Sequence, residues 1–153
     1  MSRVQLALNV PNIDQAVDFY SKLFATEPYK RKPGYANFAI ADPPLKLVLF
    51  ERAGAETRLN HLGVEVPDSD AVWAHQQRLA GEGVESLEES GTCCFAKQDK
   101  VWVDAPDGSW EIYAVLEDSD TFGQNSVKVE GAPNVDDLLC CASVPEAEAR
   151  CCG

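Results

Sequence analysis

Three polar residues with metal-ligating atoms fall in segments whose apolar residues alternate, the pattern of half-buried strands: Gln5, His61 and Glu111. Successive side chains of a strand point to opposite faces, so each of the three lies opposite the apolar residues of its own segment. They offer an amide oxygen, an imidazole nitrogen and a carboxylate, and three protein ligands leave positions open for water, dioxygen or substrate. The spacing alone leaves a second interpretation open, in which His61 is a hydrogen-bonded structural residue and Gln5 an ordinary strand residue.

The six cysteines form three adjacent pairs: Cys93-Cys94, Cys140-Cys141 and Cys151-Cys152. Adjacent cysteines do not bridge each other easily, because successive side chains diverge and the disulfide geometry is demanding. Thiolates do bind soft metals and metalloids well. For Cys93 and Cys94 to reach one soft atom, residues 89–94 must form a loop instead of a regular strand, and Lys97 and Lys100 would favour the thiolate forms. The alternative is that both cysteines simply pack in this loop.

An internal repeat supplies the elements that position these residues. Residues 5–11 (QLALNVP) align without a gap with residues 61–67 (HLGVEVP), which puts Gln5 and His61 at equivalent positions. In each copy a helix follows, at about 12–24 and 69–80, with an apolar stripe at helical spacing in the first. The strands expected after the helices are 28–31, 35–41 and 45–51 in the first copy and 84–87, 101–104 and 110–116 in the second.

The repeat predicts an α+β fold of two pseudo-symmetric βαβββ modules, residues 1–58 and 59–117, followed by a flexible tail at 118–153 that carries four of the six cysteines. The two modules are expected to bring Gln5, His61 and Glu111 together in one cleft. The position equivalent to Glu111 in the first module lies at or beside Leu45, which cannot bind a metal, so a fourth ligand is not expected.

Composition limits the classes of partner. The chain has 153 residues, 45% of them hydrophobic and 25% charged, which is ordinary for a globular protein. Its formal net charge of −12 disfavours nucleic acid and anionic membrane surfaces as partners. Neither a signal peptide nor a membrane helix is visible in the sequence, so we expect a cytoplasmic protein whose cysteines are mostly reduced.

Two further polar residues lie next to the candidate ligands. Tyr113 shares the strand face of Glu111, where it would contact substrate or dioxygen, or simply pack. Glu65 is expected to be a surface acid.

With these motifs in place, the chain resembles a known family. The repeat with Gln5, His61 and Glu111 resembles the vicinal-oxygen-chelate superfamily, which includes glyoxalases and extradiol dioxygenases. A closer resemblance, over residues 1 to about 122, is to the ArsI/CadI-type proteins, which are carbon–arsenic lyases and their cadmium-inducible relatives. It rests on Cys93-Cys94 and on residues 3–10, 32–41, 44–49, 60–66 and 98–103.

The resemblance implies an Fe(II)-dependent, dioxygen-using lyase that cleaves the carbon–arsenic bond of trivalent organoarsenicals, such as methylarsenite, and releases arsenite. It places Gln5, His61 and Glu111 at the iron-ligand positions and Cys93 and Cys94 at the arsenic-binding positions. One alternative is a resistance protein that binds cadmium or arsenic without turnover. Another, a glyoxalase-like isomerase, is disfavoured by Leu45.

The tail cysteines Cys140, Cys141, Cys151 and Cys152 suggest one more hypothesis. A mobile segment with four thiols would raise the local thiol concentration and could pass arsenical to Cys93 and Cys94. The alternative is that these thiols are exposed and incidental. Substrate breadth and oligomeric state do not follow from the sequence.

Overall fold

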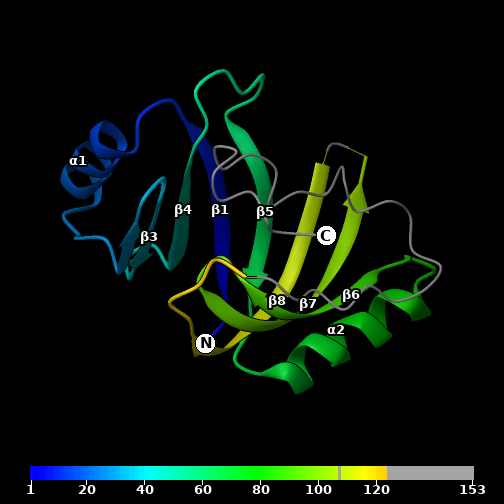
Figure 1. The fold of residues 1–153 in the computed structure, drawn as a ribbon. Coiled ribbons are helices and arrows are strands. Elements are labelled where there is room, and N and C mark those ends of the chain that lie inside the picture. Colours follow the sequence, from blue (N-terminus) through cyan, green and yellow to red (C-terminus); the bar gives the residue numbers. More distant parts are fainter. Residues whose placement is uncertain (107, 124–153) are drawn as a thin grey trace. The chain divides into compact units, whose positions relative to one another are not determined.

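The computed structural model describes residues 1–106 and 108–123. The elements follow the order β1 (Arg3–Val10), α1 (Ile13–Phe24), β2 (Lys30–Lys32), β3 (Tyr35–Ile40), β4 (Leu45–Glu51), β5 (Leu59–Glu65), α2 (Ser69–Gly81), β6 (Leu87–Cys93), β7 (Ala96–Ala105) and β8 (Gly108–Asp118). This is β-α-β-β-β twice, so the predicted fold class is confirmed (Figure 1). Within the described ranges no helix is long and apolar enough to cross a membrane.

The chain forms two compact units, Arg3–Gly63 and Val64 onward together with the first two residues. In the first unit the strands lie in the order β2-β3-β4-β1-β5, and β1 runs parallel to β4 with Gln5 opposite Lys46. In the second unit β6, β7 and β8 form an antiparallel meander. The division falls inside β5, so that the strand carrying His61 leads from one unit into the other.

Helix α1 covers one face of the strands of the first unit (Figure 1). Asn12 caps it, accepting a hydrogen bond from the Gln15 N–H at 2.9 Å, and the helix ends at Ala25 in the left-handed conformation. The apolar side of β1 packs into the same core as Ile13 and Val17. Gln5 therefore lies on the opposite face of β1, as the alternation predicted, and is 4% exposed.

Helix α2 plays the same part in the second unit. Asp68 caps it through the Ala71 N–H at 2.9 Å. Its Val72 packs against Val66, which follows β5, and against three strand residues: Val101, Ile112 and Ala114. Since Ile112 and Ala114 point toward this core, Glu111 and Tyr113 occupy the other face of β8, as predicted, and both are buried.

The prediction of a loop over residues 89–94 was wrong. Strand β6 continues through Ser90-Gly91 to Cys93, paired with β7 in the register Cys93↔Ala96, and only Cys94-Phe95 form the connection. Ser and Gly are turn residues, but here both pair with β7, and cross-strand pairing overrides their local preference. The strand predicted at 84–87 was wrong except at Leu87, where β6 begins, and β7 extends the predicted strand 101–104 at both ends.

The end of the last strand lies near this hairpin connection. Strand β8 ends at Asp118, and the Ser119 N–H donates to the Phe95 carbonyl at 2.9 Å. The tail was predicted to begin at residue 118. Residues 124–153, with Cys140, Cys141, Cys151 and Cys152, lie outside the described part of the chain.

Candidate functional site

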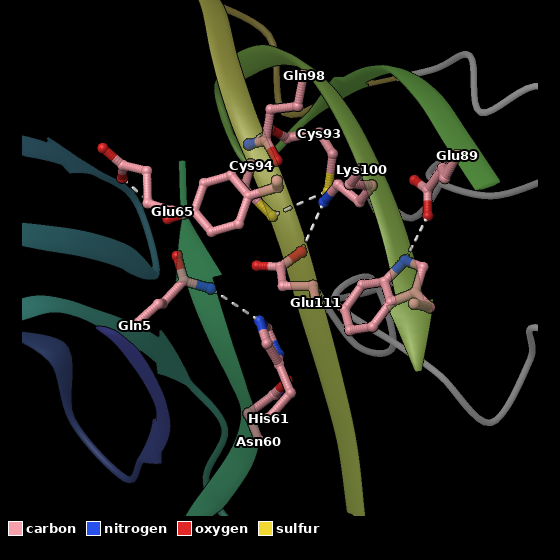
Figure 2. A network of polar contacts seen from close by, with 12 residues as sticks. Gln5, Asn60, His61, Glu65, Glu89, Cys93, Cys94, Gln98, Lys100 and Glu111 are labelled. Carbon is pink, nitrogen blue, oxygen red and sulfur yellow. Dashed lines mark hydrogen bonds and ion pairs between the residues drawn. The ribbon is translucent and has the colours of Figure 1, made fainter. Parts of the chain in front are cut away.

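Gln5 and His61 form a buried polar pair in the first unit (Figure 2). Both are 4% exposed, and the Gln5 amide nitrogen lies 3.1 Å from His61 Nε2. On the other side of the ring, His61 Nδ1 lies 2.7 Å from Asn60 Oδ1, while the Asn60 amide nitrogen donates to Asn9 Oδ1 at 2.9 Å. A carbonyl oxygen only accepts, so His61 Nδ1 carries the proton and Nε2 is left with its lone pair.

This pair fits two ligand positions of a divalent metal. A first-row metal bonds imidazole nitrogen at about 2.1 Å, so adjacent ligands of one ion lie about 3 Å apart, close to the observed 3.1 Å. A half-turn of the Gln5 amide puts its oxygen at the place of the nitrogen, since the two atoms are nearly interchangeable in shape. Asn60 fixes the ring orientation and the tautomer in the way that outer partners of metal-bound histidines do.

Glu111 lies in the second unit and is paired with a buried cation. Its Oε2 accepts from Lys100 Nζ at 2.9 Å, with side chains only 3% and 2% exposed. The Lys100 ammonium also lies 5.4 Å from the centre of the Trp102 ring and 5.9 Å from that of Tyr113. The cation offsets the cost of burying the Glu111 carboxylate, and the two ring faces favour the buried ammonium. Lys100, expected to assist the cysteines, is thus an ion-pair partner of Glu111, whereas Lys97 is exposed.

Tyr113 and Glu65 form a second polar contact on this face. The Tyr113 hydroxyl donates to Glu65 Oε2 at 3.0 Å, and Glu65, expected to be a surface acid, is half-buried. Burial, and to a lesser degree the Glu111 and Glu65 carboxylates, raise the pKa of Tyr113 well above its ordinary value. The phenol therefore stays protonated at neutral pH and serves as a hydrogen-bond donor.

The Cys93 and Cys94 thiols are buried, and their sulfur atoms lie 3.0 Å apart (Figure 2). Cys94 and Phe95 both have positive φ angles, 55° and 63°, as in the two-residue type I′ connections of hairpins. The left-handed conformation of Cys94 breaks the alternation of the strand, so both sulfur atoms reach one point without the loop that the sequence seemed to require. Gln98 holds the backbone here, donating to the Cys93 carbonyl at 3.1 Å.

No group of three or more His, Cys, Asp or Glu that could hold a metal occurs within residues 1–106 and 108–123. A set of Gln5, His61 and Glu111 contains only two such residues. Gln5 and His61 belong to the first unit and Glu111 to the second, so the meeting of the three in one site stays a prediction.

The β4 residues at the position equivalent to Glu111 carry no metal-ligating atom that could serve as a fourth ligand. Leu45 itself packs against the core under α1. The residue beside it that pairs with Gln5 on β4 is Lys46, whose ammonium does not bind a cation.

Three residues around these groups were not found by sequence reasoning: Asn60, Gln98 and Trp102. Asn60 directly precedes His61, and this adjacency was the one available signal for it. Gln98, Lys100 and Trp102 occupy every second position of β7 and so share one face of the strand. A prediction of β7 at its full length would have placed them together.

Comparison with known proteins identifies the family. The model of the Glyoxalase/Bleomycin resistance protein/Dioxygenase superfamily matches residues 3–111. The cadmium-induced protein CadI of Mycobacterium bovis is 63% identical over 125 residues, 80% of this chain and 82% of its own. The trivalent organoarsenical cleaving enzyme of Thermomonospora curvata is 54% identical over 144 residues, 92% of this chain and 89% of its own.

A solved structure supports the fold. The Mn(II)-bound glyoxalase from Novosphingobium aromaticivorans aligns with a TM-score of 0.56 at 17% identity, over 79% of this chain and 42% of that one. The duplicated βαβββ fold, the match over residues 3–111 and the two sequence relatives agree. The chain therefore belongs to the glyoxalase/bleomycin resistance protein/dioxygenase superfamily and, within it, to the group that contains the cadmium-induced protein and the trivalent organoarsenical cleaving enzymes.

Proposed function

We propose that this protein is an Fe(II)- and dioxygen-dependent lyase that cleaves the carbon–arsenic bond of trivalent organoarsenicals, such as methylarsenite, and releases arsenite. The observation that carries the proposal is the buried Cys93–Cys94 pair, whose sulfur atoms lie 3.0 Å apart. The 54% identity to a protein named trivalent organoarsenical cleaving enzyme supports the same substrate class.

The thiols would bind the arsenic atom. Trivalent arsenic is soft and prefers sulfur ligands. Methylarsenite carries two hydroxyl groups, and each Cys93 or Cys94 thiol that forms an As–S bond gives up its proton to release one hydroxyl as water. The product of binding is a methylarsenic dithiolate, with two waters released and no change of oxidation state. Because both thiols are buried, the bound arsenical would be shielded from bulk water.

Gln5, His61 and Glu111 would hold the metal. They supply an amide oxygen, a neutral imidazole and a carboxylate, a hard and borderline set that suits Fe(II) and leaves positions open. Bound Fe(II) supplies the one-electron chemistry that dioxygen requires. Asn60 would keep His61 in the tautomer with Nε2 unprotonated, and Lys100 would hold the Glu111 carboxylate through Oε2.

Tyr113 would contribute a hydrogen-bond donor that does not ionise near neutral pH. Its hydroxyl donates to Glu65 at 3.0 Å, and its raised pKa keeps the proton in place. The net charge of −12 disfavours nucleic acid as a partner, and the need for reduced thiols favours the cytosol.

A second candidate function is sequestration of cadmium or arsenite without turnover. Two observations favour it: the cysteine pair itself, and the 63% identity to a protein named for its induction by cadmium. Sequestration by thiols requires no hard ligands, so it leaves the buried Gln5–His61 pair and Glu111 without a role.

One experiment separates the two functions. The protein is loaded anaerobically with Fe(II), mixed with methylarsenite and exposed to air, and free arsenite is measured over time. The proposed lyase releases many equivalents of arsenite per chain, and none without Fe(II) or dioxygen. Retention of about one methylarsenite per chain with no arsenite would replace the lyase by the sequestering protein.

A further inference from the structure

The connection that brings the two thiols together has an unfavourable backbone conformation. Cys94 and Phe95 have φ angles of 55° and 63°, in the left-handed region that costs little only for glycine, asparagine and aspartate. Connections of this kind usually carry Asn-Gly or Gly-Gly. A bulky residue such as Phe95 persists there only where surrounding contacts hold it.

The segment Ser119–Gly123, here called the strap, provides these contacts. The Ser119 N–H donates to the Phe95 carbonyl at 2.9 Å, and the Phe95 N–H donates to the Phe122 carbonyl at 3.5 Å. The Phe95 and Phe122 rings meet edge to face, with centroids 5.3 Å apart. Both backbone groups and the side chain of Phe95 are therefore engaged by one short stretch of chain.

Gly123 allows the strap to lie this close. It is buried, with a φ of 132°, and a Cβ atom at this position would lie 1.8 Å from the Thr92 carbonyl oxygen and 3.1 Å from the Cys93 Cα. Any other residue would have to displace either the strap or the end of β6. The strap is itself shaped by the Ser119 hydroxyl, which accepts from the Thr121 N–H at 3.1 Å.

We propose that Phe122 and Gly123 are positioning residues for arsenical binding, because the strap holds Cys94 and Phe95 in the conformation that brings the two sulfur atoms to one point. The proposal rests on the proposed function only in taking the Cys93–Cys94 pair as the arsenical-binding group. The strap selects the backbone conformation that lets two thiols act on one atom.

The test measures binding alone, with phenylarsine oxide as the probe. The full chain is used with Cys140→Ser, Cys141→Ser, Cys151→Ser and Cys152→Ser, so that only the hairpin pair can chelate arsenic. Gly123→Ala and Phe122→Ala are each expected to weaken phenylarsine oxide binding by about tenfold or more. Alkylation by iodoacetamide, which needs one thiol at a time, should become no slower. The exposed Glu117→Ala serves as the matched control and should leave both readouts unchanged.

A rescue variant distinguishes positioning from general stabilisation. Glycine adopts the left-handed conformation without support, so Phe95→Gly added to Phe122→Ala should return the affinity to within about threefold of the parent. Full affinity in the two strap variants, or no rescue by Phe95→Gly, would overturn the proposal. If Gly123→Ala fails to fold, the comparison of Phe122→Ala with and without Phe95→Gly still tests it. If Cys93→Ser in the same background leaves phenylarsine oxide binding unchanged, both the proposed function and the strap's role fail. If binding follows the predictions but no arsenite is ever released, only the lyase fails.

Discussion

The two compact units each pack a helix against strands but differ in the polar groups they bury. In the first unit the buried pair is Gln5 and His61, and Asn60 contacts the other side of the His61 ring. In the second the buried face carries an ion pair, Lys100–Glu111, and two thiols. In both, a capped helix covers the apolar side of the strands.

This difference shows that a repeat can keep the residues that build its fold while the residues that bind metals or substrates change. The shared pattern of apolar residues builds the strands and helices of both copies, while a few positions on the face away from the helix are free to differ. Lys46 on β4 and Glu111 on β8 illustrate this, since one strand offers a cation where the other offers a carboxylate. We infer that both copies contribute to one metal site, and that the second copy alone provides the arsenic site.

The strongest test of the metal site is removal of one proposed ligand from each compact unit, His61 from the first and Glu111 from the second. His61→Ala and Glu111→Gln should each lower the rate of arsenite release by about a thousandfold or more, because the metal is lost. Glutamine is chosen at position 111 because its amide oxygen can still accept a hydrogen bond from the buried Lys100 ammonium, whereas alanine would leave no acceptor. A variant that retains near-normal turnover would remove that residue from the ligand set.

The buried charges of the second copy predict a contrast in stability. Lys100→Met removes the cation paired with the buried Glu111 carboxylate and should lower the free energy of unfolding by about 3–5 kcal/mol. Lys46→Met in the first copy, where the lysine is only half-buried, should cost about 1 kcal/mol or less. Urea unfolding of the metal-free proteins measures both, and equal losses would contradict the contrast.

The thiols should be separable from the metal site. Cys93→Ser or Cys94→Ser should weaken organoarsenical binding by about a hundredfold, because one thiolate loses the chelate advantage of two. Iron binding should be unchanged, since the hard and soft ligands are different residues. Titrations followed by protein fluorescence report the arsenical. Unchanged affinity in both variants would exclude the cysteine pair as the substrate site.

Gln5 should contribute less to Fe(II) affinity than His61. An amide oxygen is the weakest donor of the three, so Gln5→Ala should reduce Fe(II) affinity by about tenfold, less than His61→Ala. The comparison requires only an anaerobic equilibrium titration of both variants. Equal losses would mean that Gln5 is as strong a determinant of the site as His61.

The smallest effect is expected from the tail. Truncation after Gly123 keeps the strap and removes Cys140, Cys141, Cys151 and Cys152. If these thiols capture arsenical, the truncated enzyme should keep its maximal rate but lose about two- to fivefold in efficiency at low arsenical concentration. Equal efficiency at all concentrations would leave the tail thiols without a role in the reaction.

Strand alternation was enough to predict most of the fold and the facing of the candidate ligands. The match between residues 5–11 and 61–67 predicted the duplicated modules. Strand alternation predicted that Gln5 and Glu111 lie on the faces of β1 and β8 that point away from the helices, as they do. These inferences succeed because burial of apolar files is a local, periodic property.

The hairpin at Cys93 and Cys94 could not be predicted in the same way. Its conformation depends on pairing of β6 with β7 and on contacts from residues 119–123, which are distant in sequence. The Lys100–Glu111 ion pair was not predicted for a related reason. A lysine is expected to be exposed unless the pairing of its strand shows a buried acidic partner, and the pairing of β7 with β8 was not known from the sequence.

Anaerobic Fe(II) binding by equilibrium dialysis tests the central claim most directly, namely that His61 and Glu111 are both ligands of one metal ion. The wild-type chain, His61→Ala and Glu111→Gln are compared at equal protein concentration, with circular dichroism confirming that each is folded. The account predicts one tightly bound Fe(II) per wild-type chain and none in either variant. One tightly bound Fe(II) in either folded variant would contradict it.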